Sequence, residues 1–103
     1  MKLTTARRKA SSLTAEDLEN ICGKAEEAAR RYILSRVPRN KVLYLTISVD
    51  AERSNDGEIT VDVDVEVQLS RTMRGFNVKK LVNEAVEESF RVLDEFFGTG
   101  GEG

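Results

Sequence analysis

The stretch that decides the fold is Ile59-Thr60-Val61-Asp62-Val63-Asp64-Val65-Glu66-Val67, in which apolar and polar residues alternate without a break. An alternation with a period of two predicts a β-strand with one buried and one solvated face. A second run with the same period covers residues 43–52, and the turn sequence Ser54-Asn55-Asp56-Gly57 separates the two runs. Because these residue types favour tight turns, the two strands are predicted to form an antiparallel hairpin.

The register of this hairpin follows from the parity of its apolar residues, which occupy odd positions in both runs. Cross-strand partners point to the same face of a sheet, so odd residues must pair with odd residues. This parity excludes a two-residue loop and favours a three-residue loop at 55–57, with Gly57 in the left-handed conformation as a bulge. The expected pairs are Ser54–Glu58, Asp50–Asp62, Val49–Val63, Ile47–Val65 and Leu45–Val67.

Two segments with apolar residues at three- and four-residue spacing flank the hairpin and predict amphipathic helices. The first helix is expected from about Ala15 to about Arg36, with Thr14 as its N-cap and Asp17 as the acidic partner of that cap. Pro38 ends it, because the residue before a proline is pushed out of the helical region.

The second helix begins after Asn77, a typical N-cap residue, and its apolar stripe reaches Phe97 before Gly98 stops the helix. The predicted fold class is therefore α+β: a single domain in the order helix-strand-strand-helix, with an antiparallel β-hairpin covered on one face by two helices. Residues 13–98 form this domain. We expect residues 1–12 to be a flexible basic tail and residues 99–103 a disordered glycine-rich tail.

The composition makes most enzyme classes improbable. The chain of 103 residues has no histidine, the commonest general base and metal ligand, and Cys22 is its single cysteine, so no internal disulfide can form. Cys22 lies in the apolar stripe of the first helix and is interpreted as a buried structural thiol. We expect no enzyme activity and no cofactor. The chain has no apolar run of membrane-spanning length and no signal-peptide core, which predicts a cytoplasmic protein with no membrane partner.

Acidic residues on the solvated strand face are a candidate metal site, because clustered carboxylates bind hard cations. Asp62, Asp64 and Glu66 repeat at every second position. Residues two apart in a strand are separated by about 6.5 Å, too far for three in a row to reach one ion. A solvated acidic face is therefore favoured, and no metal ligand is predicted.

Topology divides the charges of the chain between two ends of the hairpin. The end of the first helix, the start of the first strand, the end of the second strand and the start of the second helix must meet. Nine cations are expected there: Arg30, Arg31, Arg36, Arg39, Lys41, Arg71, Arg74, Lys79 and Lys80. The acidic residues of the opposite end are Glu16, Asp17, Glu19, Asp50, Glu52, Asp56, Glu58, Asp62, Asp94 and Glu95. The net charge of −2 conceals this separation, which can steer a partner.

The start of the second helix is the candidate binding site. Lys79 and Lys80 lie in its first turn, where the helix dipole disfavours cations, and Gly75 precedes them in a loop that offers backbone amides. This combination predicts a phosphate or RNA contact. The candidate residues are Arg71, Arg74, Lys79, Lys80, Arg36, Arg39 and Lys41. The alternative is an ordinary solvated charged surface. Phe76 either stacks on a base or staples the second helix to the core.

The predicted sheet needs a partner. A two-stranded sheet is only marginally stable alone and leaves both edges unpaired. A homodimer or heterodimer formed through strand edges would join two hairpins into a four-stranded sheet. The alternative is a monomer whose tails protect the edges.

The order of elements, with the alternating strand at residues 59–67 leading to a long second helix, resembles a small uncharacterised archaeal family with a helix-strand-strand-helix domain. The resemblance covers roughly residues 13–98 and implies no particular chemistry. The segment 43–97 is more faintly similar to the small dimerising subunit of the KEOPS tRNA-modifying complex.

Three functional hypotheses follow from the sequence. The leading hypothesis is a non-enzymatic protein-interaction module, a dimeric accessory subunit of a larger cytoplasmic assembly. The second is an RNA-binding protein that contacts phosphates through its basic end, with Arg7, Arg8 and Lys9 as an auxiliary arm. The third is a small enzyme with a carboxylate-bound metal ion.

Overall fold

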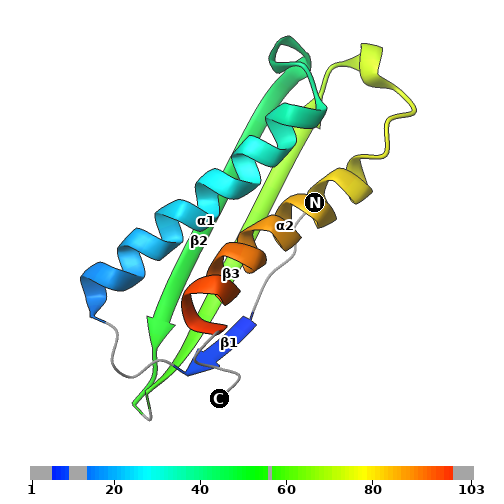
Figure 1. The fold of residues 1–103 in the computed structure, drawn as a ribbon. Helices are drawn as coiled ribbons and strands as arrows, with labels where there is room; N and C mark the ends of the chain where they lie inside the picture. The colour runs from blue at the N-terminus through cyan, green and yellow to red at the C-terminus, as the bar shows by residue number, and fades with distance from the viewer. Residues whose placement is uncertain (1–5, 10–13, 56, 99–103) are drawn as a thin grey trace.

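The computed structural model describes residues 6–9, 14–55 and 57–98 (Figure 1). Its regular elements are β1 (Ala6–Lys9), α1 (Ala15–Arg36), β2 (Val42–Arg53), β3 (Glu58–Leu69) and α2 (Val78–Leu93). Three short turns complete the order: the 3-10 turns η1 (Arg39–Lys41) and η2 (Arg71–Met73), and the π-helical turn η3 (Asp94–Gly98). The predicted α+β class and the order of its two helices and two long strands are confirmed.

The β2–β3 hairpin has the predicted register. Its pairs include Leu45–Val67, Ile47–Val65, Val49–Val63 and Asp50–Asp62. The loop also agrees, since the Ser54 amide donates a 2.9 Å hydrogen bond to the Glu58 carbonyl and Gly57 has a φ of 87°. Parity of the apolar residues was therefore sufficient to fix both the loop length and the strand alignment.

One residue of the predicted alternation does not join the buried face. The register shifts between Val42 and Tyr44, which leaves Leu43 as an extra residue in a β-bulge. The side chain of Leu43 is 63% exposed and that of Tyr44 is 51% exposed. The expectation that Leu43 belongs to the dry side of the strand is wrong, because the extra residue breaks the period of two.

The sheet has a third strand that the sequence analysis did not predict. β1 pairs antiparallel with β3, with Ala6 opposite Val61 and Lys9 opposite Glu58, so the strand order is β1-β3-β2. The prediction of a flexible tail over residues 1–12 is wrong for residues 6–9. Strand pairing uses main-chain groups and can therefore occur without an apolar period. Residues 1–5, 10–13 and the predicted tail at 99–103 lie outside the described residues.

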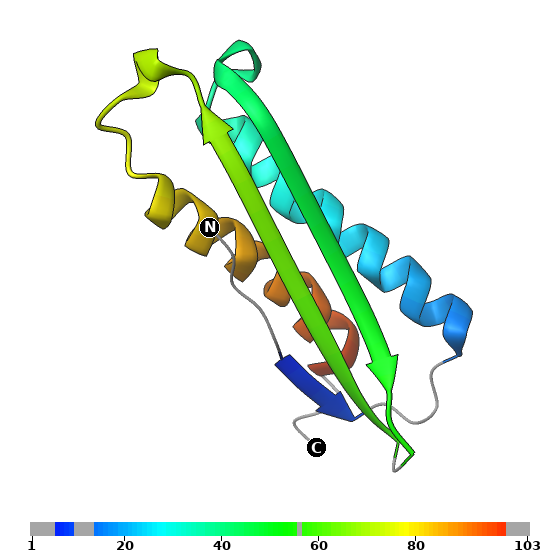
Figure 2. The same cartoon turned by 180° about the vertical axis from the view of Figure 1, so that it is seen from behind.

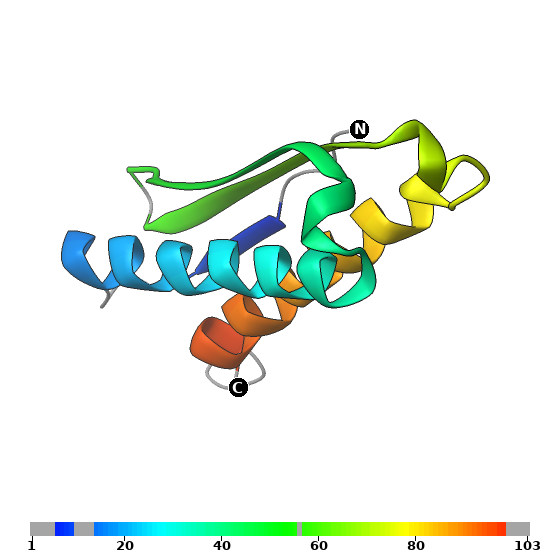
Figure 3. The ribbon, with the colours of Figure 1, turned by 90° about the horizontal axis from the view of Figure 1, so that it is seen from above.

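Both helices cover the same face of the sheet, and Figure 2 shows the sheet from the side that neither helix covers. Seen along the layers in Figure 3, α1 and α2 pack against each other beneath the strands. Small residues allow this close approach: Ala25 and Ala29 are fully buried, and the buried Ser89 hydroxyl donates a 2.7 Å hydrogen bond to the Ala25 carbonyl. The core is completed by Ile21, Ile33, Val37, Ile47, Ile59, Val61, Val63, Val65, Leu81, Val82, Ala85, Val86, Leu93 and Phe97.

The helix ends follow the predicted caps. The Thr14 hydroxyl accepts from the Asp17 amide at 3.0 Å, and the Asp17 carboxylate accepts from the Thr14 amide at 3.1 Å, which completes a capping box. Asn77 Oδ1 accepts from the Lys80 amide at 3.0 Å at the start of α2. The final helical turn, η3, ends at Gly98 as predicted. No helix in the described part of the chain has the length and apolar character needed to cross a bilayer.

Candidate functional site

The segments that were predicted to meet at the basic end do meet there. The Ser70 amide, which follows β3, donates a 2.8 Å hydrogen bond to the carbonyl of Lys41 in η1. In Figure 1, η1 and η2 lie together at the top of the molecule, beside the end of α1. Chain connectivity therefore predicted correctly that the ends of these segments lie together.

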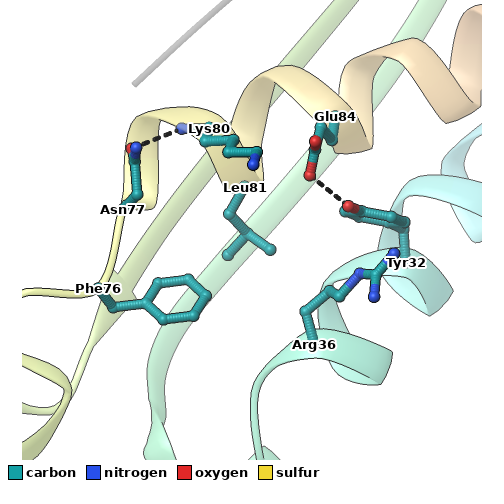
Figure 4. Close-up of a pocket in the computed structure, with 7 residues that line it drawn as sticks. All are labelled: Tyr32, Arg36, Phe76, Asn77, Lys80, Leu81 and Glu84. Carbon is teal, nitrogen blue, oxygen red and sulfur yellow. Dashed lines mark hydrogen bonds between the residues drawn. The ribbon is translucent and has the colours of Figure 1, made fainter.

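A cleft of about 410 Å³ lies between the last turns of α1 and the first turns of α2 (Figure 4). Its walls combine two cations, one carboxylate, a phenol, an amide and two apolar side chains. The lining residues are Tyr32, Arg36, Phe76, Asn77, Lys80, Leu81 and Glu84. Such a mixture offers both an apolar surface and groups that pair with an anion.

A hydrogen bond between the two helices closes one side of this cleft. The Tyr32 hydroxyl donates to Glu84 Oε1, and the Arg36 guanidinium carbon lies 4.8 Å from the centre of the Tyr32 ring (Figure 4). The acceptor carboxylate of Glu84 raises the pKa of Tyr32, burial adds to this effect, and Arg36 opposes it. Tyr32 is therefore a protonated donor at neutral pH, and Arg36 is held over its ring by a cation–π interaction.

Phe76 and Leu81 form the apolar part of the cleft. Phe76 directly precedes the Asn77 cap, and the nearly buried Leu81 is the fourth residue of α2, which is the spacing of a hydrophobic staple. Both side chains line the same cleft (Figure 4). The staple spacing agrees with one of the two predicted roles of Phe76. Its ring is 36% exposed, so part of its surface is also open to a ligand.

The structure divides the seven predicted contact residues among three places. Arg36 and Lys80 line the cleft, whereas Arg71 and Arg74 line a neighbouring hollow of about 470 Å³ that shares Phe76. The remaining three, Arg39 and Lys41 of η1 and Lys79 of α2, line neither of these two hollows.

The predicted backbone part of the anion site is weaker than expected. The amides of Arg74 and Phe76 already donate to the carbonyls of Arg71 and Met73, and the Lys80 amide donates to the Asn77 cap. Gly75 has the left-handed φ of 90° that the loop required. Because turns and the cap occupy these amides, an anion here would be bound mainly by side chains.

Two of the nine cations at the basic end are already paired along α1. Arg30 forms an ion pair with Glu26 at 2.7 Å, and Arg31 forms one with Glu27 at 2.8 Å.

The sequence analysis did not predict Glu84 as a cleft residue. A half-buried tyrosine hydroxyl needs a hydrogen-bond acceptor, and this need was the one sequence signal for a residue such as Glu84. The sequence did not show where in the chain that acceptor lies.

The outer edge of β2 is the second candidate site. The Ser54–Glu58 hydrogen bond means that even residues of β2 direct their backbone groups to β3, so those of Leu45, Ile47, Val49 and Ala51 point outward. No strand among the described residues pairs with this edge. These backbone groups are therefore a template for an added strand.

A groove of about 450 Å³ runs beside this edge, between α1 and β2. Its apolar lining includes Leu18, Cys22, Val49 and Ala51. Cys22 is only half buried, and burial together with the Asp50 charge raises its pKa. The thiol is therefore protonated at neutral pH and is a weak nucleophile.

The uncovered face of the sheet carries Asp50, Asp62, Asp64 and Glu66. Within residues 6–9, 14–55 and 57–98, no three acidic or cysteine side chains are arranged closely enough to hold a metal ion.

The fold and these surfaces define a small α+β domain whose sheet is backed by two helices and has no partner strand along the outer edge of β2 among the described residues. The chain belongs to the family described as protein of unknown function (DUF3194), whose model matches residues 11–96. The predicted membership of an uncharacterised archaeal family is thereby confirmed.

Two solved structures from archaea share the fold. A crystal structure from Thermococcus onnurineus NA1 is 21% identical, with a TM-score of 0.68 over 100% of this chain and 99% of that chain. The solution structure of a hypothetical protein from Methanothermobacter thermautotrophicus is 24% identical, with a TM-score of 0.62 over 87% of this chain and 94% of that chain. No curated protein matches the sequence. The fainter similarity to the KEOPS subunit finds no support in these comparisons.

Proposed function

We propose that this chain is a non-enzymatic protein-interaction module, a dimeric accessory subunit of a larger cytoplasmic assembly that associates through an open edge of its sheet. The observation that carries this proposal is the outer edge of β2, whose outward backbone groups have no partner strand in the described part of the chain. Strand addition satisfies such groups through main-chain hydrogen bonds, and neighbouring side chains then select the partner.

Exposed apolar side chains at the same edge support this proposal. Leu43 and Tyr44, at the start of β2, are two of the four exposed large hydrophobic residues among those described. Their burial in an interface would stabilise a complex by about 25 cal/mol for each Å² of apolar surface removed from water. The absence of catalysis is proposed because the chain has no histidine and its single thiol has a raised pKa.

The cleft supports a second candidate function, RNA binding. Arg36 and Lys80 reach one cleft from different helices, and Phe76 offers an exposed ring between this cleft and the hollow that holds Arg71 and Arg74. Phosphates paired with these cations would give an affinity that falls steeply with salt. Few aromatic residues are available to read bases, which favours backbone contacts over sequence recognition.

A pull-down of the tagged chain from native extract, with and without nuclease, distinguishes protein interaction from RNA binding. Two double variants accompany the wild type: Leu43→Asp with Tyr44→Ala at the strand edge, and Arg74→Ala with Lys79→Ala at the basic end. All four residues are exposed, so each variant is expected to fold.

An interaction module retains stoichiometric protein partners after nuclease treatment, loses them in the edge variant and keeps them in the basic-end variant. RNA recovery that disappears in the basic-end variant, with protein partners lost on nuclease treatment, would replace the first function by the second.

A further inference from the structure

We propose that the partner at the outer edge of β2 is a second copy of this chain, paired antiparallel about a two-fold axis close to Ile47 and Ser48. This inference rests on the proposed function and specifies the partner. Each copy contributes a three-stranded sheet, so the joined sheet has six strands instead of the predicted four. A two-fold axis perpendicular to the sheet makes the two β2 strands antiparallel and keeps all four helices on one face.

The charges along β2 suit this arrangement. Asp50 and Glu52 lie toward one end of the strand, and the uncovered face is neutral at Tyr44, Thr46 and Ser48. Antiparallel pairing about the middle of β2 places the acidic end of one β2 strand beside the neutral beginning of the partner's β2 strand. Lys41 of η1 directly precedes that neutral beginning. No two carboxylates then lie directly opposite each other.

The other open edge is unsuited to self-pairing. Among the described residues, β1 pairs with β3 as far as Val61, which leaves residues 62–69 of β3 without a neighbouring strand on that side. In an antiparallel pair at this edge, Asp64 of one copy would lie opposite Glu66 of the other, or Asp64 and Glu66 would each lie opposite or close to the same residue of the other copy. Like charges directly opposite each other destabilise a sheet, so the acidic face protects this edge from its own copies.

The apolar groups at the β2 edge also match each other. A two-fold axis near Ile47 and Ser48 sets Leu43 of one copy opposite residues 49–53 of the other, at the mouth of the groove between α1 and β2. That groove is lined by the half-buried Leu18, Cys22, Val49 and Ala51, whereas Leu43 is 63% exposed. In each half, the dimer thus covers an apolar groove and Leu43, the most exposed large apolar residue in the described part of the chain.

Cysteine cross-linking tests the edge and the register together. In a Cys22→Ala background the chain has no other thiol. Even residues of β2 occupy non-hydrogen-bonded positions in the new strand pair, where Cα atoms are about 4.5 Å apart and within reach of a disulfide. We expect disulfide dimers from Ser48→Cys, from Thr46→Cys, or from an equimolar mixture of the two. Gln68→Cys, at the open edge of β3, serves as the control and is expected to stay reduced. Cross-linking at Gln68 alone, or at none of these positions, would overturn the proposal.

The mass in solution gives a second test. Light scattering is expected to give about 23 kDa for the wild type, twice the 11.5 kDa of one chain. Leu43→Asp is expected to raise the dissociation constant about tenfold or more, because it loses apolar contact and adds a charge beside the partner's Asp50 and Glu52. Leu43→Lys, which faces the same acidic end, is expected to weaken the dimer less. Phe96→Asp in η3, which removes another exposed aromatic residue, is expected to remain dimeric.

A dimer that Leu43→Asp and Leu43→Lys weaken equally would contradict the antiparallel charge arrangement. A monomeric wild type with a nuclease-resistant partner that the edge variant loses would refute the second copy and leave the interaction module intact. A monomeric wild type without any such partner would refute both.

Discussion

At the scale of single residues, Gly57 fixes the alignment of the whole hairpin. Its φ of 87° lies in the left-handed region, where a Cβ atom crowds the following carbonyl oxygen. The Gly57 amide donates a 3.0 Å hydrogen bond to the Ser54 carbonyl, and this bond closes the three-residue loop. A loop of this length keeps odd residues opposite odd residues and so keeps every valine of β3 on the core side.

Substitution of this glycine tests the dependence of stability on backbone conformation. Gly57→Ala is expected to lower the free energy of unfolding by about 1–2 kcal/mol, because alanine adopts the left-handed conformation only with strain. Gly57→Asn is expected to cost less, since asparagine tolerates that region. Urea denaturation of both variants measures the difference. Equal stability of the alanine variant and the wild type would mean that Gly57 does not require its positive φ.

At the scale of elements, local sequence patterns predicted the helix starts and the strand that local interactions define. The capping box at Thr14 and the cap at Asn77 define where α1 and α2 begin, and the period of two defines β3. β1 was missed because its pairing with β3 uses main-chain groups, which leave no side-chain period. The bulge at Leu43 was missed for a related reason: a single extra residue does not change the composition of the strand.

The candidate site was predicted only in part, because it joins residues distant in sequence. Connectivity identified Arg36 and Lys80 as neighbours, and both line the cleft. The pairing of Tyr32 with Glu84 spans 52 residues and depends on how α1 and α2 cross, which no local pattern records.

The hydrogen bond between these two helices predicts a pH dependence. Its acceptor Glu84 is the main cause that raises the folded-state pKa of Tyr32 above the ordinary value of about 10. The hydrogen bond therefore contributes its full stabilisation below the ordinary pKa, and the contribution is lost as pH rises through the raised one. Thermal unfolding of the wild type and Tyr32→Phe should accordingly differ at neutral pH and converge in strong alkali.

A spectroscopic titration isolates the same group. The chain has two tyrosines and no tryptophan, so Tyr44→Phe leaves Tyr32 as the single phenol. The tyrosinate absorbance of this variant is expected to rise with a midpoint above about 10, and Glu84→Gln is expected to move the midpoint down. A midpoint that does not respond to residue 84 would contradict the assigned hydrogen bond.

The packing of α1 against α2 gives a matched pair of substitutions. Ala29 is fully buried in the core, whereas Ala28 is half buried beside an open hollow of about 370 Å³. Ala29→Leu is expected to lower the free energy of unfolding by about 1–3 kcal/mol through overpacking, and Ala28→Leu by much less. Urea denaturation measures both. A loss of stability from Ala29→Leu as small as that from Ala28→Leu would mean that the helices can separate at little cost.

At the scale of the whole molecule, an amphipathic sheet, two covering helices and a divided charge distribution act together. The helices bury one face of the sheet and leave the edge of β2 unsatisfied among the described residues. The acidic face discourages pairing at the open edge of β3, and the charge gradient along β2 favours an antiparallel copy. These features together favour association through the outer edge of β2.

Hydrogen exchange of the β2 amides tests this association most directly. The amides of Ile47 and Val49 point to the outer edge, whereas those of Thr46 and Ser48 point to β3. In the associated protein both sets are expected to be protected, and dilution or the Leu43→Asp substitution should release only the outward set. Rapid exchange of the Ile47 and Val49 amides at every protein concentration, with Thr46 and Ser48 still protected, would show that the edge has no partner.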